Sequence, residues 1–77
     1  MTDPMRKAFD RYKSAYKGAV LFFRLGDVYE VFYEDAEIVR CVFGEKRVQI
    51  KLAEVNKYIT VLQALGNEVQ IVTEREP

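Results

Sequence analysis

The sequence predicts a small α/β domain of the α+β kind, in which a mixed β-sheet is flanked by helices. Two stretches carry apolar residues at helical spacing, and a third begins with acidic residues and ends at a glycine. Four further stretches are strand-like, which gives the order α-β-β-α-β-α-β. With 77 residues, 49% of them hydrophobic, the chain can bury one modest core. We therefore expect residues 1–77 to form a single domain.

The first helix is expected to begin at Thr2-Asp3-Pro4. An Asp side chain accepts hydrogen bonds from the free amides of a helix start, and Pro loses nothing at the first helical position. Gly18 can take a left-handed conformation and is expected to end the helix. The apolar stripe of this helix consists of Met5, Ala8, Phe9, Tyr12 and Tyr16.

A β-hairpin is expected next. Residues 19–25 (AVLFFRL) and 28–33 (VYEVFY) are rich in aromatic and β-branched residues, which predicts two largely buried strands. Gly26-Asp27 lies between them. Glycine in the first central position suits a two-residue turn of type II′, so a tight hairpin follows.

The acidic residues Glu34, Asp35 and Glu37 are expected in the first turn of a second helix that ends at Gly44, because negative charge is favoured beside free amides. They are adjacent rather than convergent, so we expect them to face water instead of holding a metal ion. Cys41, in the same helix, is expected to be a small buried residue.

The second half of the chain predicts a strand, a helix and a strand. Residues 46–52 (KRVQIKL) alternate apolar with polar or basic side chains, which indicates a strand with one wet, basic face. Residues 69–73 (VQIVT) predict the last strand, and the tail TEREP is expected to be frayed. Between the strands, a helix that stops at Gly66-Asn67 is predicted by the apolar positions Val55, Tyr58, Ile59, Leu62 and Leu65.

The charges cancel overall but are unevenly placed. Residues 1–18 carry five basic and two acidic residues, residues 26–45 six acidic and one basic, and residues 46–58 four basic and one acidic. Such a surface suits contact with a polyanion or head-to-tail contact between copies, and it is also what an ordinary solvated surface can show.

Several function classes are poorly supported. A single Cys and no His argue against a disulfide framework, a zinc cluster and His-based catalysis. Phosphate-binding glycine motifs and the nucleophile elbow are missing from the sequence. We expect no enzyme, no cofactor and no metal. The start resembles no signal peptide and no run is long enough to span a membrane, so a soluble cytoplasmic protein without membrane contact is expected. A binding module is the better class.

The hairpin region resembles a known family. VLFFRLGDVYEVFYEDA, residues 20–36, is similar to the start of the N-terminal mismatch-recognition domain (domain I) of the MutS family of DNA mismatch-repair proteins, which typically reads LLFYRMGDFYELFYDDA. Residues 50–74, IKLAEVNKYITVLQALGNEVQIVTE, resemble the last helix and strand of that domain. The resemblance covers roughly residues 3–74 and implies a mixed sheet flanked by helices.

The resemblance also implies a DNA contact. In mismatch-sensing members, a Phe-x-Glu motif enters the minor groove, where the ring wedges against the mispaired base and the carboxylate hydrogen-bonds it. The motif falls here on Val28-Tyr29-Glu30. The glutamate is present, but valine lacks a ring, and base–aromatic stacking is worth roughly 1–3 kcal/mol per base. Weak or altered binding of mismatched DNA is therefore expected.

The expected DNA-contacting residues are Leu25, Val28, Glu30, Lys46, Arg47 and Lys51. The basic members would neutralise phosphates, and the expected partner is double-stranded or mismatched DNA. The family segment before the third strand is shortened here to about GEKRVQ, and no connector, clamp or ATPase follows residue 77, so a stand-alone module without ATPase is expected. The alternative is an interaction or scaffold domain that kept the fold, lost DNA binding, and contacts another copy or a protein partner.

Overall fold

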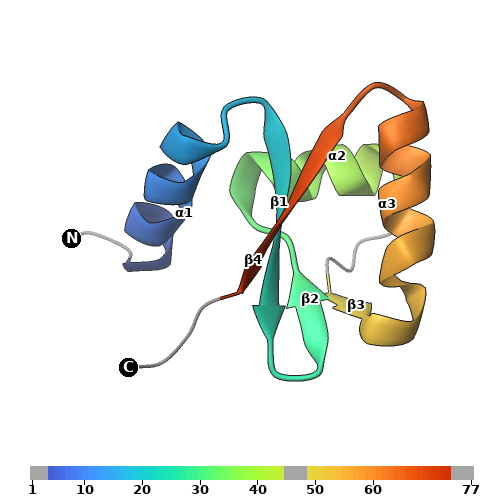
Figure 1. Ribbon diagram of the computed structural model, residues 1–77, viewed down its shortest axis with the longest axis horizontal. Helices are drawn as coiled ribbons and strands as arrows, with labels where there is room; N and C mark the ends of the chain where they lie inside the picture. The colour runs from blue at the N-terminus through green and yellow to red at the C-terminus, as the bar shows by residue number, and fades with distance from the viewer. Residues whose placement is uncertain (1–3, 45–48, 74–77) are drawn as a thin grey trace.

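The computed structural model describes residues 4–44 and 49–73, and over these ranges it confirms the predicted order of helices and strands. The strands form one mixed sheet in the order β3-β2-β1-β4, in which β1 is antiparallel to β2 and parallel to β4, and β2 is antiparallel to β3 (Figure 1). The elements are α1 (Pro4–Ala15), β1 (Ala19–Leu25), β2 (Val28–Glu30), α2 (Tyr33–Phe43), β3 (Gln49–Lys51), the short 3-10 turn η1 (Leu52–Glu54), α3 (Val55–Ala64) and β4 (Glu68–Thr73).

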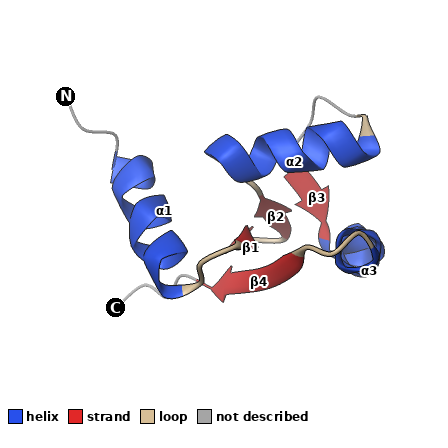
Figure 2. Cartoon of the chain, turned by 90° about the horizontal axis from the view of Figure 1, so that it is seen from above, coloured by secondary structure: helices blue, strands red, loops and turns tan. Residues whose placement is uncertain are grey.

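The sheet buries a different hydrophobic cluster on each face, because successive strand residues point to opposite sides. On one side, here called the α3 face, Phe22 packs with Val39 of α2 and Leu62 of α3. On the other, the α1 face, Phe23 packs with Phe9 of α1. Figure 2 shows α1 and α3 on opposite sides of the strands. Strand β1 therefore lies at the centre of the core, as its five buried residues in a row indicate.

The β1–β2 hairpin closes with the predicted two-residue turn. Leu25 and Val28 are partners across the ladder, which leaves only Gly26 and Asp27 in the loop. Gly26 has φ of +67°, and Asp27 does not share this left-handed backbone. A type II′ turn requires that combination, so the glycine is needed at this position.

Strand β2 is shorter than predicted. The prediction of a strand over residues 28–33 is wrong at its end, because β2 stops at Glu30 and α2 begins at Tyr33. Val31 is buried in the cluster on the α3 face, whereas Phe32 and Tyr33 pack against the α1 cluster. Tyr33 has φ of +55°, a conformation that costs a non-glycine residue roughly 1–3 kcal/mol. The aromatic residues thus leave the sheet to pack under α1.

Three apolar predictions fail at the surface. Cys41 is exposed rather than buried, because it lies two residues, or about 200° around the helix, from the buried Val39. Leu65 is 61% exposed, since α3 ends at Ala64 before it can continue the apolar stripe. Tyr16 is 41% exposed because it lies beyond the last residue of α1.

Strand β3 confirms the wet-face prediction over Gln49–Lys51. Ile50 is buried, and its two neighbours are exposed. Leu52 begins the 3-10 turn, so the predicted strand is one residue too long there. The predicted cap Asp3, strand residues 46–48 and the tail after Thr73 lie outside the described residues. None of the described helices is long and apolar enough to cross a membrane.

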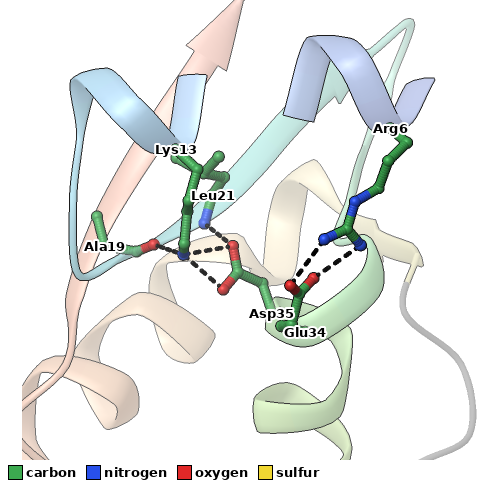
Figure 3. Close-up of polar contacts among 6 residues, drawn as sticks. All are labelled: Arg6, Lys13, Ala19, Leu21, Glu34 and Asp35. Atoms are coloured by element: carbon green, nitrogen blue, oxygen red, sulfur yellow. Dashed lines mark hydrogen bonds and ion pairs between the residues drawn. The ribbon is translucent and has the colours of Figure 1, made fainter. Parts of the chain in front are cut away.

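One acidic residue of α2 is buried, contrary to the expectation that all three face water. Asp35 is 1% exposed, and its carboxylate accepts hydrogen bonds from the backbone N–H of Leu21 at 3.0 Å and from Lys13 Nζ at 2.7 Å (Figure 3). Lys13 also donates to the carbonyl oxygen of Ala19. The carboxylate therefore joins α1, β1 and α2, while Glu34 and Glu37 are exposed as predicted.

Candidate nucleic-acid interface

Three of the predicted DNA-contacting residues form one row across the sheet at the hairpin end. Val28 is the partner of Leu25 on β1 and of Lys51 on β3. Partners in neighbouring strands point to the same side, which here is the α1 face. Leu25 is 37% exposed, Lys51 is exposed and Val28 is half-buried. The row therefore presents two aliphatic side chains beside one cation.

The next row adds Glu30 and a residue that sequence reasoning missed. Glu30 is the partner of Phe23 on β1 and of Gln49 on β3, on the same face as Val28. Gln49 Nε2 donates to Glu30 Oε2 at 2.7 Å. Gln49 is exposed and two residues from Lys51, so strand alternation alone could have placed it in this surface. We call Leu25, Val28, Glu30, Gln49 and Lys51 the hairpin surface.

The structure thus brings together four of the six predicted residues. Lys46 and Arg47 lie outside the described residues, so their predicted phosphate contacts stay predictions. Lys51 makes no ion pair or hydrogen bond with the described part of the chain. Lys51 is itself exposed.

The hairpin is supported from behind by contacts on the α3 face. Tyr29 packs against Phe22 with 6.4 Å between ring centroids. The Arg24 guanidinium lies 5.8 Å from the centroid of the Tyr29 ring, and Arg24 Nε donates to the carbonyl oxygen of Gly26 at 2.8 Å. These contacts pack Tyr29 against the core and tie Arg24 to the turn.

A chain of aromatic ring contacts begins at Phe23, the strand partner of Glu30, and leads into the core. Phe23, the partner of Glu30, lies 5.5 Å from Phe32 in an edge-to-face arrangement. Tyr33 continues this chain to Phe9 of α1 at 5.2 Å. Such ring pairs contribute roughly 0.5–1.5 kcal/mol each beyond their buried area. The row that carries Glu30 therefore continues, through Phe23, into the aromatic packing of the core.

A shallow depression of about 490 Å³ lies between the start of α1 and α2. Arg6 lines this depression, and its Nη1 and Nη2 donate to the Glu34 carboxylate at 3.1 and 2.9 Å (Figure 3). The hydrogen bond from Arg6 lowers the pKa of Glu34 below its ordinary value, and the reciprocal bond raises the pKa of Arg6. The residues that line the depression are Arg6, Val31, Phe32, Tyr33, Glu34, Ala36, Glu37 and Arg40. No group of three or more metal-binding side chains occurs in the described ranges.

Comparison with known proteins identifies the fold. A family model described as MutS domain I matches residues 3–77. The chain belongs to the MutS domain I family. This result confirms the predicted resemblance and the predicted fold class, a mixed α/β domain. The hairpin surface is the part of this MutS domain I chain where the motif Val28-Tyr29-Glu30 lies.

Individual relatives give the same result. Over 81 residues the chain is 38% identical to the DNA mismatch repair protein MutS of Thermosipho melanesiensis and 36% identical to that of Thermotoga petrophila; each match covers 95% of this chain and 10% of the relative. The MutS protein of Caldanaerobacter subterraneus is 63% identical over 35 residues, which cover 46% of this chain and 4% of that protein. The MutS domain I chain thus spans about a tenth of the length of relatives that it matches over most of its own length.

Proposed function

We propose that this chain is a DNA-binding module of the mismatch-repair family, and that it contacts double-stranded DNA through the hairpin surface. The observation that carries the proposal is the row Leu25–Val28–Lys51, which places an exposed leucine and a half-buried valine next to a lysine that makes no ion pair with a described residue. Proteins that bend DNA combine these two features, an apolar wedge and a phosphate contact. Residues 1–77 would act as one domain.

The wedge would be aliphatic instead of aromatic. Val28 alone is short, but its partner Leu25 points to the same face and is the more exposed of the two. Leucine is among the side chains that insert between base steps in minor-groove binders. Unstacking a step costs a few kcal/mol and costs least where pairing is already poor. A weak preference for a mismatch would therefore come from the deformability of the DNA.

Lys51 would hold the duplex beside the wedge. As the partner of Val28, it projects from the same row and can reach a phosphate while the aliphatic pair faces the groove. Each phosphate that a cation neutralises contributes about −0.9 to the slope of log K against log salt concentration. The proposal concerns binding alone and assigns no catalytic step to this domain. The same proposal includes a role for this domain in mismatch repair.

The test is a titration of labelled matched, mismatched and single-stranded DNA at two salt concentrations, followed by fluorescence anisotropy. Affinity for duplex is expected to fall with salt, and Lys51→Gln is expected to reduce the salt slope by about one. Lys17→Gln is the control, because Lys17 is an exposed lysine beyond the opposite end of β1. Binding that is undetectable or insensitive to salt would reject the proposal.

One observation favours a second candidate, an interaction domain without DNA binding. Leu25 ends β1 and Leu52 directly follows β3, and each is 37% exposed at the same end of the sheet, which suits a protein contact. Analytical ultracentrifugation would then give a mass well above the 9.0 kDa of the single chain, and Leu25→Ser would return it to that value. A monomer that binds duplex DNA would exclude this candidate.

A further inference from the structure

The two outer strands of the sheet differ in how their free sides are protected. In the order β3-β2-β1-β4, the strands β3 and β4 each have one neighbour among the described strands, so each leaves backbone N–H and C=O groups unpaired on its outer side. Strand β3 is three residues long over its described part and ends at the exposed Lys51. Short length and an exposed lysine are two devices that keep edge strands from pairing with other chains. The β3 side is therefore protected.

Strand β4 lacks these devices. It is six residues long and reads EVQIVT, without lysine, proline or glycine. Figure 1 shows β4 in front of β1, and Figure 2 shows it at the margin of the fold, with none of the described helices beyond it. The Gln70 side chain bends back and donates to the carbonyl oxygen of Ile71 at 3.1 Å, a bond that a backbone N–H can replace. The outer side of β4 is therefore open to another strand.

The apolar side chains of β4 are incompletely covered. Val69 and Ile71 pack on the α3 face against the cluster that contains Phe22, yet each is only half-buried. Strand neighbours on both sides normally cover such residues, and here β1 covers one side only. A strand added on the free side would remove more of this apolar surface from water, which favours association.

We propose that β4 pairs antiparallel with β4 of a second copy of this chain, so that the two sheets join into one. A two-fold axis perpendicular to the sheet keeps corresponding faces on the same side, so Val69 and Ile71 of both copies meet on the α3 face. The charged residue of β4, Glu68, is at its first position. The two Glu68 carboxylates then lie at opposite ends of the paired strands and do not oppose each other. Strand β4 is thus complementary to itself in backbone, apolar surface and charge.

This contact is separate from the hairpin surface. Strand β4 contributes no residue to that surface, so the inference does not depend on DNA binding. Strands β1 and β4 are parallel, and Arg24 near the end of β1 is the partner of Thr73 at the end of β4. The two-fold axis therefore places the hairpin turns of the two copies at opposite ends of the joined sheet, with Leu25 and Leu52 outside the contact.

Two measurements on the wild-type chain test the inference. Sedimentation equilibrium from about 10 µM to 1 mM, a range that includes weak complexes, is expected to show a mass that rises toward twice the 9.0 kDa of the single chain. Amide hydrogen exchange followed by NMR is expected to slow with concentration at alternate residues of β4, because alternate amides point to the free side. A mass that stays at 9.0 kDa would overturn the inference. Protection of all β4 amides at every concentration would also overturn it, because the chain would then cover this strand itself.

Matched variants locate the contact. The double variant Gln70→Lys, Thr73→Lys places like charges along the paired strands and is expected to weaken self-association by about tenfold or more. The control is Gln63→Lys, Thr60→Lys, which makes the same two changes at exposed positions of α3 and should leave self-association unchanged. Circular dichroism of dilute samples would show that both variants fold. A dimer that persists in the β4 variant, or that Leu25→Ser abolishes, would overturn the inference in favour of contact at the hairpin end.

Discussion

Lys13 Nζ lies 2.7 Å from Oδ1 of Asp35, and this contact joins a half-buried lysine on α1 to a carboxylate that is 1% exposed on α2. Asp35 also accepts from the backbone N–H of Leu21, so one buried carboxylate connects both helices to the central strand (Figure 3). A buried charge is tolerated when it is paired and hydrogen-bonded. The arrangement ties α1 to the central strand and to α2.

Lys13→Met is expected to destabilise the domain by about 3–5 kcal/mol, because it leaves the Asp35 carboxylate buried without its counter-charge. The free energy of unfolding would be measured with urea and circular dichroism. Lys17→Met serves as the comparison, since Lys17 is exposed and makes no ion pair with a described residue. Equal midpoints for the two variants would show that the pair contributes nothing.

Val28→Phe is expected to raise the preference for a mismatched over a matched duplex by about tenfold, because a ring at this position can stack on a base. Anisotropy titrations with both duplexes give the ratio. Lys17→Phe places a new ring beyond the opposite end of β1 and should leave the ratio unchanged. If Val28→Phe also leaves it unchanged, the hairpin does not enter the groove.

Arg6→Gln is expected to raise the pKa of Glu34 toward its ordinary value, because the hydrogen bond from Arg6 is the main cause of the lowered pKa. The Glu34 carboxyl chemical shift, followed by NMR, would show this rise in pKa. A range of about pH 2 to 7 spans the titration of an ordinary carboxyl. Since the folded pKa is lowered, the pair's contribution is present above the ordinary pKa and is lost as pH falls through the folded one. An unchanged titration curve of Glu34 in the Arg6→Gln variant would show that Arg6 does not bind Glu34 in solution.

Gly26→Ala is expected to destabilise the domain by about 1–3 kcal/mol, because position 26 has φ of +67° and a type II′ turn disfavours a side chain there. No atom outside the turn approaches an added Cβ within 4 Å, so the cost is conformational and not a clash. Asp27→Ala, next along the turn, should change the urea midpoint little. A stable Gly26→Ala variant would contradict the turn type.

Cys41 is expected to react with a thiol reagent such as dithionitrobenzoate in the folded protein, since its side chain is exposed on α2. The rate in buffer should approach the rate in denaturant, measured by absorbance. A thiol that reacts only after unfolding would show that Cys41 is buried. A Cys41→Ser variant reports any background reaction.

Much of the fold could be predicted from local pattern. The run of aromatic and β-branched residues gave the bounds of β1, and Gly26-Asp27 gave the hairpin and its turn type, because both depend on neighbours in sequence. The motif that includes Val28 and Glu30 identified the family. These features depend on residues that are close together in the sequence, so the sequence alone is enough to predict them.

Other features were decided only by tertiary structure. Nothing in the sequence near Asp35 indicated burial, because its partners Lys13 and Leu21 lie 22 and 14 residues away along the chain. Phe32 and Tyr33 fit a strand by composition, yet they leave the sheet to pack under α1. The hydrogen bond between Gln49 and Glu30 likewise depends on strand register. Long-range packing selects among local conformations of similar energy, so such contacts appear only when the chain is folded.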